Sequence, residues 1–364
     1  MPDLVLNARF LMRPMTGVDR VATELALALM RRGPPLGFSR LRARRPAGEI
    51  ASAEARPASL LDITSPSPAR FGSQVWEQLS LARADPQDWL LSPCNIGPIG
   101  RKRQIVIIHD AQVFRQPKAY SRAFRTWYRV AQPHLARTAA QILTVSEFSR
   151  GELAECGIAD ADKVGVVPNG ADHILRTAPD AKTLTRHNLT PDGFILVIGS
   201  LAPHKNLARL AKAALARADR RMPLVIAGGG NPSVFAEAGI KPDPDLRFLG
   251  RITDAELRAL YEAARALAIP SITEGFGLPA VEAMTCGCPV IASTGGALPE
   301  VCGDAALLVD PLDTGGWTAA MDLITEDDAL AQDLRAAGLA RAERFTWDSA
   351  AARLAEHLAP LAMH

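Results

Sequence analysis

Apolar residues occur along the chain in short runs that alternate with longer amphipathic stretches. Runs such as 105–108 and 194–198 are apolar throughout, which is typical of strands buried on both faces of a parallel sheet. Stretches such as 122–137 and 254–265 repeat their apolar residues at the spacing of a helix. Because the two kinds alternate, the pattern predicts an α/β protein with doubly wound parallel sheets covered by helices. The remaining predicted elements are strands at 4–10, 141–145, 164–167, 223–227, 266–269 and 289–292, and helices at 19–31, 147–156, 206–217 and 279–285.

The chain length of 364 residues favours two domains. A strand that ends in VVPNGAD gives way to polar sequence at 179–191, and a new unit begins at Phe194. We therefore predict a Rossmann-like N-terminal domain over 1–182 and a second over 183–345. The last stretch, 346–364, is predicted to be a helix that packs back on the first domain. In such domains ligands bind at the carboxyl ends of the strands, in the cleft between the two sheets.

Basic and acidic residues nearly balance, with 41 Lys and Arg against 39 Asp and Glu. A net charge of +2 excludes a nucleic-acid-binding protein held by bulk charge. The basic residues gather in the first half, because residues 1–180 contain 24 Lys and Arg but 17 Asp and Glu. Residues 32–70 are rich in Pro, Arg, Ser and Ala, a composition that predicts irregular surface structure.

The five cysteines do not have the spacing of a metal site. Cys286 and Cys288 are one residue short of a C-x-x-C pair, and small buried thiols in a reducing cytoplasm are the simpler interpretation. No apolar run approaches the roughly 18 residues of a membrane span. Asn7, Arg9 and Arg13 interrupt the apolar start that a signal peptide needs. We therefore expect a cytoplasmic protein that at most lies on a membrane surface.

The densest group of ligand-binding features lies in residues 266–293, ALAIPSITEGFGLPAVEAMTCGCPVIAS. A predicted strand leads into a glycine-rich loop that contains Glu274, and Pro279 fits the first position of the helix that follows. Glu282 falls on that helix, whose start offers free N–H groups to an anion. Carboxylates accept hydrogen bonds from sugar hydroxyls, so the segment predicts a ligand with both phosphate and hydroxyl groups.

This segment resembles the E-x7-E signature of the GT4 family of retaining glycosyltransferases, which have the GT-B fold. Further stretches resemble the family in the same order along the chain. They are TGVDRVATELALAL (16–29), IIHDAQVF (107–114), TVSEFSR (144–150), VVPNGAD (166–172), GSLAPHKNL (199–207) and FLGRITDAELRALYEAA (248–264). The resemblance implies two Rossmann-like domains that face each other across a cleft.

The resemblance also implies roles for individual residues. Glu282 would bind the ribose hydroxyls of a nucleotide, Glu274 the hydroxyls of the transferred sugar, and Lys205 the diphosphate. Fixed positive charge aimed at the leaving diphosphate would lower the barrier to transfer. The rest of the implied donor site in the second domain consists of Gly199, Ser200, Gly275, Phe276, Gly277 and Leu278.

Two implied site residues lie in the first domain. Gly17 would lie against the diphosphate, and His109 would line the reaction centre near the sugar. One departure from the family concerns the second cation on the diphosphate. Many members have an arginine where this chain has Ser200 or His204. His204 and Arg251 both remain candidates for that cation.

The function implied is transfer of a hexose, with retention, from a nucleotide-sugar to a glycan or lipid-linked acceptor in surface polysaccharide synthesis. GDP-mannose is the favoured donor, and UDP-glucose and UDP-N-acetylglucosamine stay open. A GT-B nucleotide-sugar epimerase and a non-catalytic partner subunit are the alternatives from other classes. No motif requires a metal or another cofactor, because Lys205 and the helix start supply the positive charge.

The basic residues of the first half leave two interpretations open. They form either a solvated basic surface or a site for an anionic membrane or lipid-diphosphate acceptor, which would place the protein peripherally on the inner face of the membrane. The residues concerned are Arg31, Arg32, Arg40, Arg42, Arg44, Arg45, Arg101, Lys102 and Arg103.

Overall fold

A computed structural model describes residues 1–51, 57–68, 72–199, 202–228, 241 and 243–362. The chain divides into two compact units. Unit 1 comprises Met1–Gly170 and Trp347–His364, and unit 2 comprises Ala171–Thr346.

Unit 1 is built on a parallel sheet with the strand order β3-β2-β1-β4-β5-β6-β7. Neighbouring strands in it pair in parallel, as predicted from the alternation of apolar runs and amphipathic stretches. The strands are β1 (Leu4–Asn7), β2 (Leu41–Pro46), β3 (Thr64–Ser67), β4 (Trp89–Ser92), β5 (Gln104–Ile107), β6 (Gln141–Thr144) and β7 (Val164–Val166).

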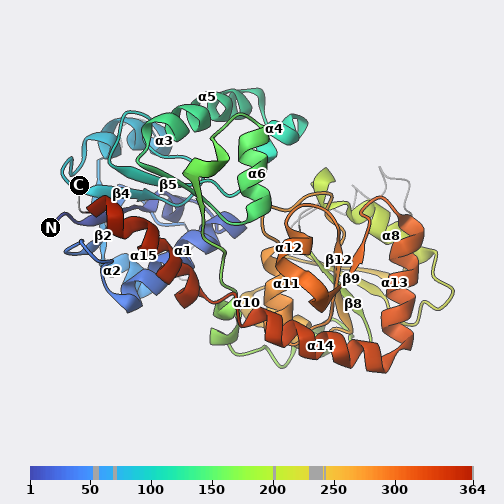
Figure 1. Cartoon of the computed structure of the whole chain (residues 1–364). Coiled ribbons are helices and arrows are strands. Elements are labelled where there is room, and N and C mark those ends of the chain that lie inside the picture. The colour runs from blue at the N-terminus through green and yellow to red at the C-terminus, as the bar shows by residue number, and fades with distance from the viewer. Residues whose placement is uncertain (52–56, 69–71, 200–201, 229–240, 242, 363–364) are drawn as a thin grey trace. The chain divides into compact units, whose positions relative to one another are not determined.

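Helices cover both faces of this sheet (Figure 1). In that view α3 and α5 lie above the strands, whereas α1, α2 and α15 lie below them. The last helix, α15, packs beside α1, so the C-terminal segment belongs to unit 1. The helices are η1 (Ala8–Met12), α1 (Gly17–Arg32), α2 (Ala58–Asp62), α3 (Gly72–Trp76), η3 (Glu77–Leu81), α4 (Gln112–Arg115), η4 (Pro117–Ala119), α5 (Arg122–Thr138), α6 (Glu147–Glu155), η5 (Ala161–Lys163) and α15 (Trp347–Ala362).

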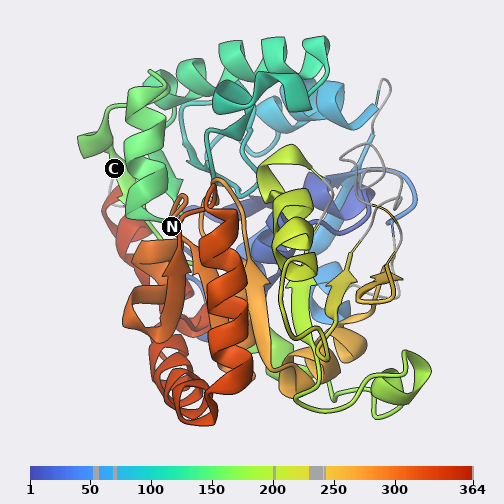
Figure 2. The same cartoon turned by 90° about the vertical axis from the view of Figure 1, so that its right-hand side faces the viewer.

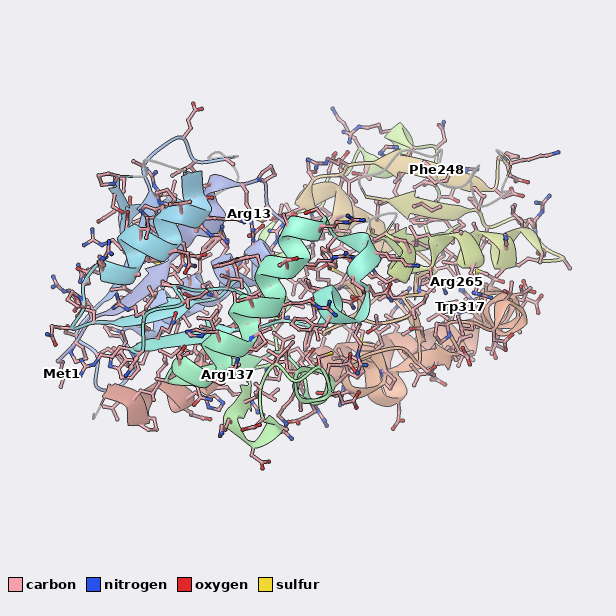
Figure 3. All side chains as sticks on the ribbon, turned by 90° about the horizontal axis from the view of Figure 1, so that it is seen from above. Met1, Arg13, Arg137, Phe248, Arg265 and Trp317 are labelled. Atoms are coloured by element: carbon pink, nitrogen blue, oxygen red, sulfur yellow. The ribbon has the colours of Figure 1, made fainter. Side chains whose placement is uncertain are left out.

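Unit 2 contains a second parallel sheet, with the order β10-β9-β8-β11-β12-β13. Figure 2 shows α8 and α13 side by side on one face of it, and Trp317 of α13, labelled in Figure 3, is fully buried there. The strands are β8 (Ile195–Ile198), β9 (Leu224–Ala227), β10 (Leu246–Gly250), β11 (Ala266–Ile269), β12 (Val290–Ser293) and β13 (Ala306–Val309). The helices are η6 (Asp172–Arg176), α7 (Thr183–Arg186), η7 (Pro203–Lys205), α8 (Leu207–Leu215), α10 (Asp254–Ala263), α11 (Leu278–Thr285), α12 (Leu298–Cys302), η8 (Gly303–Ala305), α13 (Thr314–Glu326) and α14 (Asp328–Ala342).

The chain passes from unit 1 to unit 2 earlier than the sequence predicted. Residues 171–182, assigned there to the first domain, belong to unit 2. The cause is local, because η6 packs against α11 and His173 of η6 contacts Glu282 of α11.

The prediction of irregular structure for residues 32–70 is wrong at Leu41–Pro46 and Thr64–Ser67, where β2 and β3 extend the sheet, and residues 52–56 and 69–70 lie outside the described residues. β2 holds arginines at half-buried positions, which hid it from a search for apolar runs. Arg42 Nε lies 2.7 Å from Asp3 Oδ2, and its NH2 lies 2.7 Å from Asp88 Oδ2. Arg44 Nε similarly lies 3.0 Å from Asp85 Oδ2. These carboxylates neutralise the guanidinium groups and let a basic segment form a strand.

Other residues of the basic set also have partners within unit 1. Arg32 forms an ion pair with Asp348 at 2.7 Å. Arg101 is buried and donates to main-chain carbonyls, including that of Asp88 at 2.6 Å. Arg32, Arg42, Arg44 and Arg101 are therefore bound within unit 1.

The cysteines are free thiols, and Cys288 and Cys302 are buried. Burial raises the pKa of Cys94 and that of Cys286 to about 12 in each case. Among the described residues, no group of three or more His, Cys, Asp or Glu side chains could hold a metal ion. No helix in the described parts of the chain is long and apolar enough to cross a membrane.

Candidate active site

The loop between β11 and α11 has the geometry that its glycines predicted. Gly277 caps the N-terminus of α11 in the left-handed conformation, with φ of 91°. The positive φ favours glycine, and a Cβ atom at that position would also lie 2.6 Å from Leu298 Cδ2, so that side chain would have to move. Pro279 is the second residue of the helix, one position later than predicted, and still lies in its first turn. Phe276 is buried, and its ring packs edge-on against that of Phe345, with the ring centroids 5.6 Å apart.

Two further glycines shape this loop, and sequence reasoning missed them. A Cβ atom on Gly295 would lie 2.3 Å from the Ile272 carbonyl oxygen, and one on Gly296 would lie 2.3 Å from the Glu274 nitrogen. The same segment then binds the loop, because Ala297 N donates to the Glu274 carbonyl at 2.9 Å. The Gly-Gly pair after β12 is the sequence feature that could have indicated this close packing.

Glu274 and Lys205 form an ion pair in unit 2. Lys205 Nζ lies 2.6 Å from Glu274 Oε1, and Ser271 Oγ donates to the same oxygen at 2.6 Å. Both charged side chains are mostly buried, with 23% of the lysine and 14% of the glutamate exposed. A carboxylate, an ammonium group and a hydroxyl therefore meet at the carboxyl ends of β8 and β11.

The main chain around Lys205 is bonded to the β11 loop. Asn206 has a left-handed backbone, and its Nδ2 donates to the carbonyls of Pro270 and Pro311 at 3.0 Å and 2.6 Å. Ile272 N donates to the His204 carbonyl at 2.7 Å. These bonds explain how two segments far apart in sequence hold Lys205 beside Glu274.

The other residues predicted to bind the donor in unit 2 lie at different places relative to the Lys205–Glu274 pair. Gly199 follows β8, and its carbonyl oxygen would lie 2.2 Å from a Cβ atom on Gly228, so the backbones after β8 and β9 approach closely. Ser200 lies outside the described residues. Arg251 is exposed after β10, and β9 separates that strand from β8 in the sheet. Within the described residues, no contact joins Arg251 to the Lys205–Glu274 pair.

Glu282 is buried in a separate hydrogen-bonded network. Its Oε2 accepts from the Tyr261 hydroxyl at 3.0 Å, and its Oε1 lies 3.1 Å from His173 Nε2. Burial and the adjacent carboxylate raise the pKa of Tyr261 well above its usual value, so the phenol stays protonated and donates. Sequence reasoning found neither partner, because three elements distant in sequence bring them together.

In unit 1, His109 follows β5 and is buried. Its Nε2 lies 2.7 Å from the Pro93 carbonyl, and its backbone N–H donates to Asn95 Oδ1 at 2.7 Å. Burial lowers the pKa of His109, with the Pro93 carbonyl acting in the opposite direction. Because a carbonyl only accepts, Nε2 carries the hydrogen, and Nδ1 of the neutral ring is the acceptor.

Gly17 is the first residue of α1, where a capping box satisfies part of the helix start. The side chains of Thr16 and Asp19 cap each other's N–H groups, and Arg13 NH2 lies 2.6 Å from Asp19 Oδ1. Arg13 precedes the helix and is labelled in Figure 3. No atom lies within 4 Å of a Cβ placed on Gly17, so packing in unit 1 does not require glycine there.

A buried carboxylate near the carboxyl end of β1 is another feature that the sequence did not reveal. Glu77 lies in the π-helical turn η3, and its Oε1 accepts from Asn7 Nδ2 at 2.6 Å. Arg9 Nε lies 3.2 Å from the same oxygen. Burial raises the pKa of Glu77, although Arg9 and Asn7 lower it. Glu77 belongs to no recognisable motif, and only the fold places it there.

Comparison with known proteins agrees with this architecture. Residues 183–341 match the family described as glycosyl transferases group 1, and residues 15–174 match glycosyltransferase family 4. The chain is 35% identical over 260 residues to the O-antigen chain mannosyltransferase B of Escherichia coli, covering 68% of each protein. It is 32% identical over 268 residues to the MMP alpha-(1->4)-mannosyltransferase of Mycolicibacterium hassiacum, covering 70% of this chain and 62% of that protein.

The solved structure of Anabaena Alr3699/HepE in complex with UDP and glucose has a similar fold. Its TM-score is 0.73 at 19% identity, and the match covers 99% of this chain and 100% of that one. Two parallel α/β units with polar groups at strand ends define a two-domain α/β protein. The chain belongs to the glycosyltransferases of family 4, with the GT-B fold, and is therefore a glycosyltransferase.

Proposed function

We propose that the chain is a retaining hexosyltransferase that uses GDP-mannose as donor. The single observation that supports it most is the buried group formed by Lys205, Glu274 and Ser271 at the ends of β8 and β11. A cation and a carboxylate held together suit a ligand with both phosphate and hydroxyl groups. Unit 2 is the proposed donor-binding unit, and Glu282 is the proposed ribose-binding carboxylate.

The proposed reaction uses these residues without a metal or cofactor. Glu274 accepts hydrogen bonds from the sugar, and Lys205 faces the diphosphate. The bond between the anomeric carbon and the diphosphate oxygen breaks, and the acceptor oxygen bonds to the same face of that carbon. The acceptor's proton passes to the leaving phosphate oxygen. Lys205 stabilises the negative charge that grows on the diphosphate, which lowers the barrier. His109, neutral and with Nδ1 as acceptor, is the proposed unit 1 residue at the reaction centre.

Mannose is favoured because two relatives above 30% identity are described as mannosyltransferases. The first of them acts on the O-antigen chain, which supports a growing surface polysaccharide as the acceptor. A UDP-sugar donor stays the alternative, since a protein of the same fold is described with UDP and glucose. A donor panel separates these possibilities.

The cationic surface that would bind an anionic membrane on the acceptor side lies on α5 and not on β2. Arg122, Arg125 and Arg129 follow one face of α5, a helix without any acidic residue. Within the described residues none of the three has an ion-pair partner, in contrast to Arg42 and Arg44 of β2. Unpaired arginines attract anionic headgroups, each contributing about 1 kcal/mol near a membrane surface.

The experiment that tests the proposal combines nucleotide binding with donor turnover. Calorimetry with GDP and with UDP identifies the base, and release of nucleotide from GDP-mannose with an acceptor glycan measures transfer. We expect GDP to bind and GDP-mannose to react with retention at the anomeric carbon. Donor conversion without acceptor would indicate an epimerase, and no binding of either nucleotide would indicate a non-catalytic subunit.

A further inference from the structure

Three buried polar side chains meet in unit 2, each from a different element. Glu282 on α11 and His173 on η6 are each 6% exposed, and Tyr261 on α10 is fully buried. Tyr261 donates to Glu282 Oε2 at 3.0 Å, and His173 Nε2 lies 3.1 Å from Oε1. A buried carboxylate is costly unless it is hydrogen-bonded, so the two donors stabilise Glu282 in one orientation.

The chemistry of the network leaves Glu282 able to bind a further ligand. A carboxylate accepts at about four lone-pair positions and donates at none, so His173 must present a hydrogen on Nε2. Each oxygen of Glu282 accepts one of these two contacts and retains acceptor capacity. Two oxygens held at fixed positions match two neighbouring hydroxyls, as on a ribose.

His173 also has a special position along the chain. Unit 2 begins at Ala171, two residues earlier, and ends at Thr346. The two ends are bonded to each other, because Ala171 N donates to the Phe345 carbonyl at 2.9 Å. The residue that contacts Glu282 therefore lies on the segment where the chain enters unit 2, held in place by the segment where it leaves.

We infer that His173 is a positioning residue for nucleotide binding: it orients the Glu282 carboxylate toward the ribose hydroxyls from the entry segment of unit 2. This inference rests on the proposed role of Glu282 in binding the nucleotide. Tyr261, which lies on α10, donates to the other carboxylate oxygen of Glu282 and holds it in place. Loss of the His173 contact frees the carboxylate to rotate, which weakens its bonds to a diol and leaves the diphosphate contacts intact.

The test compares two ligands on a set of variants by calorimetry. The ligands are GDP or UDP, whichever the wild type binds, and the 2′,3′-dideoxy form of the same nucleotide. We expect His173→Ala to weaken binding of the natural nucleotide about tenfold, the effect of one lost hydrogen bond to a charged group. The same variant should bind the dideoxy nucleotide as the wild type does. His173→Gln, whose amide nitrogen can replace Nε2, should restore most of the affinity.

A matched control is His187→Ala, which removes a histidine of unit 2 that lies outside the network and directly after α7. Its affinity for both ligands should equal that of the wild type. Melting temperatures of all variants show whether each one folds.

The outcomes separate this inference from the proposed function. If Glu282→Ala binds the natural nucleotide as tightly as the wild type, the ribose-binding role fails and the inference with it. If Glu282→Ala loses affinity while His173→Ala does not, only the inference is overturned. Equal weakening of both nucleotides by His173→Ala would show a purely structural role and would also overturn it.

Discussion

Lys205 Nζ lies 2.6 Å from Glu274 Oε1, so the two residues assigned to different parts of the donor are partners of each other. A mostly buried ammonium or carboxylate left alone would be costly. Under the proposed function, the donor replaces this ion pair, because its hydroxyls take the place of Lys205 on Glu274 and its diphosphate takes the place of Glu274 on Lys205. Each charge then has a partner both before and after binding.

Lys205→Ala should therefore remove nearly all transfer, by about a thousandfold or more in kcat/KM, because the charge on the leaving diphosphate loses its cation. His204→Ala should cost less than a hundredfold, since the variant keeps the main-chain carbonyl that accepts from Ile272 N in the β11 loop. Lys212→Ala, which changes an exposed lysine of α8, is the control and should react as the wild type does. Equal losses in Lys205→Ala and His204→Ala would contradict this ranking.

Gly296→Ala should destabilise unit 2. Gly296 has φ of 69°, and a Cβ atom there would lie 2.3 Å from the Glu274 nitrogen and 2.4 Å from its carbonyl oxygen. The backbone of the Glu274 loop must move, which should lower the free energy of unfolding by about 2–3 kcal/mol and raise KM for the donor.

Urea unfolding and donor kinetics measure both effects of Gly296→Ala. Gly151→Ala is the matched control, because Gly151 lies in α6 and no atom is within 4 Å of a Cβ placed there. That change should be neutral or should stabilise by up to about 1 kcal/mol. A Gly296→Ala protein as stable as the wild type would show that the loop is free to adapt.

Sequence patterns could predict much of the sheet in unit 2 and the main chain of its site. The runs at β8, β9, β11 and β12 are apolar because both faces of those strands are buried, and such runs are visible in one sequence. The glycine and proline of the β11–α11 turn are also local features, and the structure has both at the start of α11.

Features that depend on distant partners could not be predicted. β2 is a strand because Asp3, Asp85 and Asp88 neutralise its arginines, and nothing in the segment LRARRP indicates those partners. His173 and Tyr261 have no motif of their own, and only the packing of η6 and α10 against α11 brings them to Glu282. Such residues are found when a buried charge is followed to its partners.

His109 should make stability depend on pH. Burial lowers its pKa in the folded protein, whereas in the unfolded chain a histidine titrates near its ordinary value of about 6.5. As the pH falls below about 6.5, the unfolded chain binds a proton that the folded protein does not, so stability is lost. Burial lowers the pKa of His357 on α15 as well, and that residue should add to the same effect.

Urea unfolding at pH 8 and pH 5.5 checks this prediction. His109→Gln keeps a nitrogen donor for the Pro93 carbonyl but does not titrate, so its loss of stability between the two pH values should be smaller than that of the wild type. His357→Gln should also reduce the loss, and the double variant should reduce it further. An unchanged pH dependence in His109→Gln would show that the ring takes up its proton in the folded state.

The arginines of α5 and β2 should behave differently toward an anionic membrane. Replacing Arg122, Arg125 and Arg129 with alanine removes unpaired charge, and should release the protein from phosphatidylglycerol vesicles at low salt without lowering its stability. Arg42→Ala should leave vesicle binding unchanged but cost about 1–2 kcal/mol of stability, because it leaves the buried carboxylate of Asp3 with fewer partners. Co-sedimentation with those vesicles and with uncharged phosphatidylcholine vesicles, together with urea unfolding, measures both effects. If the wild type sediments with neither kind of vesicle, the proposal of a membrane-bound acceptor side is wrong. If Arg42→Ala loses vesicle binding at unchanged stability, the arginines of β2 also bind the membrane.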